Sequence, residues 1–92
     1  MHQFNRTMEY LESKLDAEVD LQKFQQLSGY SYALFSRLFS ILADMTLAEY
    51  LRNRRLSEAV TDLRESSEKV IDIALKYGYE SADAFSAAFK KF

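Results

Sequence analysis

The strongest constraint on this chain is a short segment that occurs twice. The first copy reads GYSYALFSRLF and the second reads GYESADAFSAAF. The two copies align a serine and two phenylalanines at the same spacing, pairing Ser31 with Ser81, Phe35 with Phe85, and Phe39 with Phe89. Both glycines of the 92-residue chain fall inside these copies, and the chain has no proline. The fold must therefore build one local structure twice, with almost no other residue that interrupts a helix.

Each copy has the pattern of two helices joined by a tight turn. An apolar stripe at helical spacing precedes each glycine, comprising Leu21, Phe24 and Leu27 in the first copy and Val70, Ile73, Ala74 and Tyr77 in the second. Each glycine suits the left-handed position just past a helix end, with Tyr30 or Tyr79 covering the last turn. Ser31 and Ser81 then suit the N-cap of a second helix. Each copy is thus predicted to be a helix-turn-helix unit.

The second helix of each unit is expected to bury one side. Its stripe is Leu34, Phe35, Leu38, Phe39 and Leu42 in the first copy, and Phe85, Ala88, Phe89 and Phe92 in the second. Because these aromatic residues recur at helical spacing, we interpret them as core residues and not as a base-stacking platform. A further helix, predicted from about Asn5 to Leu15, would cover the first unit with Met8 and Leu11.

A long helix is predicted between the two units, over residues 46–66. It begins with a capping box formed by Thr46 and Glu49. At about 100° per residue, its early apolar residues cluster on one side and its later ones on roughly the opposite side. The early set is Leu47, Tyr50 and Leu51, and the later set is Leu56, Ala59, Val60 and Leu63. One helix therefore serves two cores, and about 20 residues span on the order of 30 Å.

Composition supports an all-α fold and removes several classes of function. The chain is 48% hydrophobic and 28% charged, which is ordinary for a folded globular domain. It has no cysteine and a single histidine, His2, so we expect neither a disulfide, nor a metal site, nor any cofactor. No stretch has the roughly 20 apolar residues that a membrane span needs, so we expect a cytoplasmic protein. Carboxylates such as Glu9 and Glu12 are typical of a solvated helix face, and we expect no enzyme.

These segments resemble the DNA-binding domain of the AraC/XylS family of bacterial transcription regulators. The matching stretches are GYSYALFSRLF, LAEYLRNRRLSEAVTDL, KVIDIALKYGYES and AFSAAFKKF, so the resemblance runs from about Met8 to Phe92. It implies two helix-turn-helix units joined by a long helix, which bind promoter DNA and usually activate transcription. The partners it implies are double-stranded DNA and RNA polymerase. The subgroup that the chain is most similar to places a small-molecule effector domain after this one, so an effector would act through a part absent from the chain.

The resemblance divides the chain into three parts: an N-terminal helix with the first helix-turn-helix at 1–45, the linker helix at 46–66, and the second helix-turn-helix at 67–92. Family members continue past the position of Phe92 into a seventh helix, so the second unit is expected to be truncated before a final helix. Two residues depart from the family pattern. Gln25 stands where a small alanine is usual, and Ala87 stands where many members have arginine.

The resemblance places base-reading positions on the second helix of each unit. In the first copy these are Tyr32, Ala33, Ser36 and Arg37, and in the second they are Ala82, Asp83, Ala84, Ser86 and Ala87. Arg37 is the best single candidate, because a guanidinium can bond both O6 and N7 of guanine. The alternative for Arg37 is a solvated arginine paired with a nearby acid. Lys90 is a candidate phosphate contact, and its alternative is a simply solvated lysine.

The second copy is expected to read bases less directly than the first. Its alanines can contact thymine methyl groups, and Asp83 could accept a hydrogen bond from cytosine N4. Alternatively, Asp83 only favours the helix dipole in the first turn. In the linker, we expect one arginine of the cluster Arg52, Arg54 and Arg55 to bridge the two units and not to touch DNA.

A second class of function stays open at this point. The formal net charge is −2 and the isoelectric point is about 5.3, whereas DNA-binding domains are usually basic. Together with Asp83 and Ala87, this charge fits a helical protein-interaction module that has lost DNA binding. Such a module would show no salt-dependent association with DNA.

Overall fold

The computed structural model describes residues 2–91, without the side chains of residues 2 and 3. This part of the chain is all helical. Its six helices are α1 (His2–Ser13), α2 (Leu21–Ser28), α3 (Tyr32–Ala43), α4 (Leu47–Glu65), α5 (Val70–Lys76) and α6 (Ala82–Lys90). We call α2 with α3 the first unit and α5 with α6 the second unit. The predicted all-α fold of two helix-turn-helix units joined by a long helix is confirmed. Phe92, the last residue of the apolar stripe predicted for the second unit, lies outside the described residues.

The two turns form as their glycines predict. Gly29 has φ of +78° and Gly78 has φ of +88°, so both occupy the left-handed region. Gly29 N–H donates to the carbonyl of Gln25 at 2.9 Å. In the second unit, Tyr79 N–H donates to the carbonyl of Ala74, also at 2.9 Å. Each short helix is therefore closed by a hydrogen bond from a turn residue back to a carbonyl of that helix.

Side chains cap the helices that follow. Ser31 Oγ accepts from Leu34 N–H at 3.2 Å, and Ser81 Oγ accepts from Ala84 N–H at 3.0 Å. Thr46 Oγ1 accepts from the Glu49 amide at 3.0 Å, which confirms the predicted start of α4. A further cap went unpredicted: Asp20 Oδ1 accepts from the amides of Gln22 and Lys23 and starts α2.

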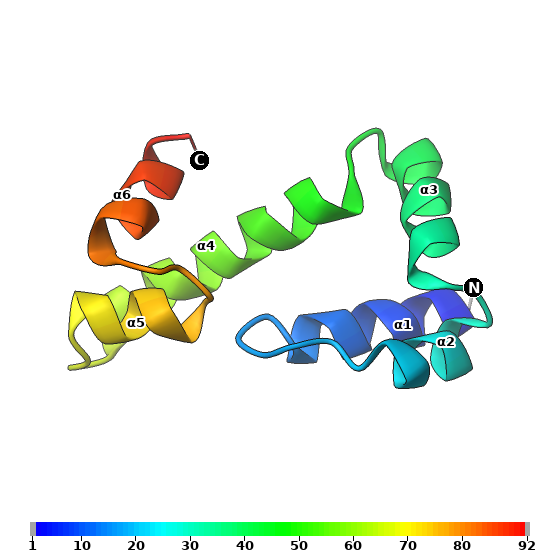
Figure 1. The fold of residues 1–92 in the computed structure, drawn as a ribbon, viewed down its shortest axis with the longest axis horizontal. Coiled ribbons are helices and arrows are strands. Elements are labelled where there is room, and N and C mark those ends of the chain that lie inside the picture. Colours follow the sequence, from blue (N-terminus) through cyan, green and yellow to red (C-terminus); the bar gives the residue numbers. More distant parts are fainter. Residues whose placement is uncertain (1, 92) are drawn as a thin grey trace.

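The linker α4 is one unbroken helix of 19 residues that contributes to two separate cores (Figure 1). Cluster 1 consists of the buried residues Tyr10, Leu11, Leu15, Phe24, Phe35, Phe39, Leu47 and Leu51. Cluster 2 consists of Leu56, Ala59, Ile73, Ala74, Tyr77 and Phe85. Within residues 2–91 the clusters share no member, and α4 contributes Leu47 and Leu51 to one and Leu56 and Ala59 to the other. The predicted switch of its apolar side is therefore real.

Several predicted core positions prove to be exposed. Besides Tyr30, which was expected to cover a turn, the exposed set is Leu21, Leu34, Leu38, Leu42, Leu63 and Val70. On α3 only Phe35 and Phe39 are buried, while Leu42 keeps 75% of its surface exposed. Helices α1 and α2 lie near the start of α3 (Figure 1), and α4 packs Tyr50 against Phe39 further along, while Leu38 and Leu42 stay on a side that is open to solvent. An open groove lined by Phe4, Leu38, Ile41 and Leu42 results.

The N-terminal helix also differs from its prediction, since α1 spans His2–Ser13 instead of Asn5 to Leu15. The chain leaves α1 through a turn in which Lys14 N–H donates to the Leu11 carbonyl. Tyr10 is buried, and its hydroxyl accepts from Asp20 N–H at 3.0 Å, which ties the loop to the helix. None of the described helices has the length and apolar character of a bilayer-spanning segment.

Candidate nucleic-acid interface

The exposed side of α3 presents a single charged group. Arg37 is exposed, and it makes no hydrogen bond or ion pair with any residue between 2 and 91. No Asp or Glu lies on α3, so Arg37 is the only charge of the helix. The acidic net charge of the chain therefore does not arise on this helix. An unpaired guanidinium on a capped, exposed helix is free to bond a nucleic acid.

The other three candidates on α3 differ in how they are presented. Ala33 is exposed, and Ser36 is partly buried. Tyr32 is also partly buried, and its ring centroid lies 5.1 Å from that of Phe24 in cluster 1. The aromatic ring of Tyr32 therefore packs against the core, which leaves only part of the side chain toward solvent.

The exposed side of α6 carries mostly small side chains, with one acidic and one basic residue. Five of its candidate positions are exposed and Ala82 is partly buried; the exposed ones are Asp83, Ala84, Ser86, Ala87 and Lys90. Asp83 lies in the first turn and Lys90 in the last, where each charge suits the helix dipole. The helix is anchored from its other side by Phe85, which is buried against Phe89 and Tyr79. Thus the two units present similar helices with different chemistry.

Two arginines of α4 are held within the molecule. Arg54 Nε donates to Glu12 Oε1 at 3.0 Å, and Arg54 Nη2 donates to Glu58 Oε1 at 3.1 Å. Arg55 Nε donates to the Leu15 carbonyl at 3.1 Å. We expected one arginine of the cluster to bridge the two units, but these two arginines bond α1, the loop after it and α4, and within the described residues neither bonds α5 or α6. Arg52 is exposed and makes no ion pair within residues 2–91.

Glu12, at the end of α1, accepts hydrogen bonds from two donor side chains. Besides Arg54, it accepts from the hydroxyl of Tyr50 at 2.8 Å. The Arg54 hydrogen bond outweighs the effect of burial and holds the pKa of Glu12 below its ordinary value of 4.5. Burial, and then the hydrogen bond to Glu12, raises the pKa of Tyr50. From the sequence, Glu12 was interpreted as part of a solvated face, because its partners lie about forty positions further along the chain.

A parallel arrangement joins α4 to α5. Asp62 Oδ2 accepts from the Tyr77 hydroxyl at 2.7 Å and from Lys76 Nζ at 3.0 Å. The Tyr77 hydrogen bond, followed by that of Lys76, lowers the pKa of Asp62 from its ordinary 3.8. Neither Lys76 nor Asp62 is therefore an independent surface charge. No cluster of three His, Cys, Asp or Glu side chains suited to a metal ion occurs in the described part of the chain.

Known proteins share this architecture. A family model described as a helix-turn-helix domain matches residues 25–92. The multiple antibiotic resistance protein MarA of Escherichia coli is 31% identical over 85 residues, which cover 92% of this chain and 67% of MarA. A solved AraC-type transcriptional regulator from Chromobacterium violaceum has the same fold, with a TM-score of 0.80 over 97% of this chain and 80% of that one, at 20% identity. The chain belongs to the AraC/XylS family.

Other relatives of this AraC/XylS domain extend beyond the matched region. The Transposon Tn10 TetD protein of Escherichia coli is 37% identical over 81 residues, which are 88% of this chain and 59% of TetD. The transcriptional activator AarP of Providencia stuartii is 37% identical over 83 residues, which are 90% of this chain and 62% of AarP. The chain thus spans about 60% of the length of these two relatives. It carries the helix-turn-helix DNA-binding domain of the family.

Proposed function

We propose that this AraC/XylS domain places α3 and α6 in two successive major-groove segments on one side of a duplex. The two helices lie at opposite ends of α4 (Figure 1). The 19 residues of α4 give it a length of about 28 Å, which compares with the roughly 34 Å that separates successive major-groove faces of B-DNA. The longest dimension of the molecule, 39 Å, also allows contacts across one helical repeat.

Within this arrangement α3 does most of the base reading, and Arg37 is its main reader. The observation that carries this assignment is an exposed guanidinium that has no partner among residues 2–91 and lies on a helix without Asp or Glu. Two hydrogen bonds to guanine O6 and N7 would discriminate against other bases by about 1–3 kcal/mol. Ala33 and Ser36 flank Arg37 and complete the reading surface, while Tyr32 contributes its hydroxyl end.

Helix α6 mainly positions the duplex. The small residues Ala82, Ala84, Ser86 and Ala87 allow α6 to approach base edges closely, and the alanines can touch thymine methyl groups. Asp83 favours a cytosine partner, because its carboxylate would otherwise be repelled by the phosphates. Lys90, at the far end of α6, contacts a phosphate.

We also propose the setting in which the domain works. It acts in the bacterial cytoplasm, where promoter DNA is found, and it activates transcription by contacting RNA polymerase. The support is that AarP is described as a transcriptional activator and that the family consists of transcription regulators. Effector control would come from a further domain.

Selection from random duplexes followed by binding measurements tests the reading role of Arg37. We expect Arg37→Ala to lower the preference for one base position by about 1–3 kcal/mol, measured by fluorescence anisotropy with the selected site and its single-base variants. Arg52→Ala is the matched control, since it removes an exposed arginine from α4, and it should keep the base preference. If Arg37→Ala keeps the full base preference, Arg37 is not the reader.

Salt dependence tests whether the domain binds DNA as proposed. Contacts to several phosphates release counterions, so the logarithm of affinity should fall with the logarithm of salt concentration with a slope of about −4 or steeper. A flat dependence with weak binding to every selected duplex would instead support the interaction-module alternative.

A further inference from the structure

The middle of α4 is where the two units could move relative to each other. Its last buried residue in cluster 1 is Leu51, and its first in cluster 2 is Leu56. The residues between them are Arg52, Asn53, Arg54 and Arg55, so no apolar side chain anchors this segment. Apolar packing therefore fixes each unit on its own end of α4, while contacts of a different kind must hold the junction.

Polar contacts from α1 fill that role. Glu12 accepts from Tyr50 and from Arg54, and Arg54 also donates to Glu58. Residues 50, 54 and 58 follow each other at four-residue intervals, so they form one line along α4 across the point where its apolar side switches. The ring of Tyr50 lies against Phe39 of α3, with centroids 5.4 Å apart. Tyr50 alone thus connects Glu12 to α3.

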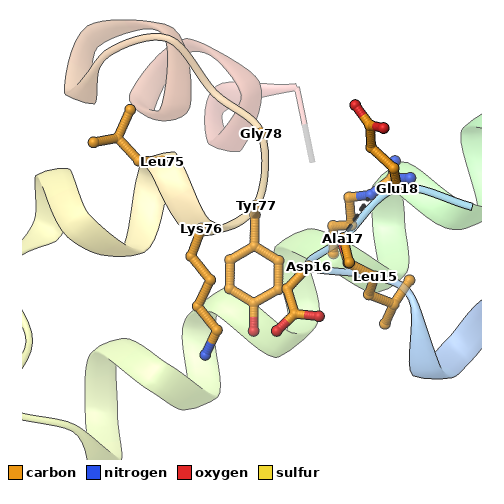
Figure 2. Close-up of a pocket in the computed structure, with 9 residues that line it drawn as sticks. Leu15, Asp16, Ala17, Glu18, Leu75, Lys76, Tyr77 and Gly78 are labelled. Atoms are coloured by element: carbon orange, nitrogen blue, oxygen red, sulfur yellow. Dashed lines mark hydrogen bonds between the residues drawn. The ribbon is translucent and has the colours of Figure 1, made fainter.

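The loop after α1 continues this contact toward the second unit. Figure 2 shows Leu15, Asp16, Ala17 and Glu18 of this loop facing Lys76, Tyr77 and Gly78 of α5 and its turn across a pocket. Asp16 contributes electrostatically to the raised pKa of Tyr77, which arises first from burial and then from the hydrogen bond to Asp62. Glu12, Asp16, Glu58 and Tyr77 together line an adjoining pocket. The end of α1 and its loop therefore bond to α4 and face the second unit across these pockets.

The ion pair itself is too exposed to serve mainly as a source of stability. The Arg54 and Glu12 side chains retain 34% and 31% of their surface, and pairs with this much exposure contribute little to folding because water screens them. Their geometry is nevertheless specific, since Arg54 Nε lies 3.0 and 3.2 Å from the two oxygens of Glu12. Such a contact can select one orientation of α1 relative to α4 without adding much to the stability of the fold.

We infer that Glu12 is a positioning residue: through Arg54 and Tyr50 it holds the junction of α4, and so sets the angle between α3 and α6. The consequence for DNA, which rests on the proposed function, is a preference for one separation between the two recognised segments. The geometric part of the inference concerns the free protein and does not depend on DNA.

Distances between spin labels test the geometric part. The chain contains no cysteine, so Ala33→Cys and Ala87→Cys introduce unique labelling sites on α3 and α6. We expect a narrow distance distribution in the otherwise unchanged protein and a broader or shifted one after Glu12→Gln. Glu9→Gln is the matched control, because it makes the same change one turn earlier on α1 at an exposed position, and it should keep the distribution narrow.

A second variant keeps this test decisive if Glu12→Gln folds poorly. Arg54→Met keeps most of the aliphatic stem and removes the guanidinium, so it should broaden the distribution in the same way. Circular dichroism establishes that each variant keeps its helices. An unchanged distribution in a folded Glu12→Gln or Arg54→Met protein would overturn the positioning role.

Duplexes with altered spacing test the consequence for DNA. The selected site is compared with versions in which one base pair is added or removed between its two segments. We expect Glu12→Gln to reduce the preference for the original spacing several-fold, while affinity for a duplex with only the first segment stays within about twofold. A broader distance distribution with unchanged spacing preference would refute the DNA consequence alone. If the unaltered protein binds no duplex, the proposed function fails and the label distances still decide the positioning role.

Discussion

The two units are near-copies in their backbone and differ in the chemistry that they present. Both close a short helix with a left-handed glycine and start the next helix with a serine cap. On the exposed side, however, the first unit has Arg37, which makes no ion pair within the described residues, whereas the second has Ala87 at the aligned position together with Asp83. The comparison teaches that the duplicated motif preserves the backbone frame of α3 and α6, while the side chains on their exposed sides differ between the two copies.

Their cores differ as well. Cluster 1 gains support from Leu11 of α1 and Leu15 of the loop after it, whereas within residues 2–91 the buried members of cluster 2 come from α4 and the second unit. The largest aromatic contribution to cluster 2 is Phe85, which is 2% exposed. The second unit therefore depends more heavily on a single side chain than the first.

The largest expected effect comes from the two core phenylalanines. Phe85→Ala and Phe24→Ala should each lower the free energy of unfolding by about 3–5 kcal/mol, because each removes a buried ring and leaves a cavity. Since the described clusters share no residue, each change should first disorder its own unit, as seen by loss of amide dispersion in NMR spectra. If each variant instead loses the dispersed amide signals of both units, the two units unfold as one.

A smaller effect is expected from restoring an arginine in the second unit. Ala87→Arg should raise affinity by about 1–3 kcal/mol for duplexes that carry guanine at the matching position, since it creates a second bidentate reader. Ala87→Lys is the control, because it adds the same charge without the planar fork and should raise affinity for all sequences alike. Equal gains for both variants would mean that the added charge meets phosphate and not bases.

The glycine turns should respond alike in both units. Gly29→Ala and Gly78→Ala should each cost about 1–2 kcal/mol of unfolding free energy, because both glycines have positive φ. An added Cβ would meet no atom within 4 Å at either site, so backbone strain is the only expected cause. Urea unfolding of the two variants checks this. A clearly larger loss at one site would show that the two turns are not equivalent.

The smallest effect concerns acid. Hydrogen bonds lower the pKa of Glu12 from 4.5, chiefly through Arg54, and that of Asp62 from 3.8, chiefly through Tyr77. The stability that each group contributes is therefore present above these ordinary values and is lost as pH falls through the lowered folded values. Glu12→Gln should flatten the decline of the urea midpoint from about pH 4.5 downward, and Asp62→Asn should do so from a slightly lower pH. An unaltered acid profile in both variants would contradict these assignments.

How far the sequence predicted the structure depends on the range of the interactions concerned. The turn glycines, the caps by Ser31 and Ser81, and the start of α4 at Thr46 were all predicted correctly. Their hydrogen bonds close within five residues, so the local sequence alone specifies them. The division of α4 between two cores was also correct, because helical periodicity directly orients its side chains.

Burial and long-range pairing could not be predicted in the same way. Leu38 and Leu42 continue the apolar pattern of α3, yet they are exposed and line an open groove, whereas Phe39 in the same half of the helix packs against Tyr50 of α4. Glu12 has the spacing of a solvated face, but its partners Tyr50 and Arg54 come from a distant part of the chain.

The sequence by itself therefore determined the helices, their turns and caps, and the family of this domain. Only the tertiary structure decided which side chains meet at the junction of α4, which apolar residues stay in water, and that Arg37 has no partner within the described chain. The physical reason is that a hydrogen bond within a helix turn needs only neighbours in sequence. The burial or pairing of a side chain instead depends on which other helix passes beside it.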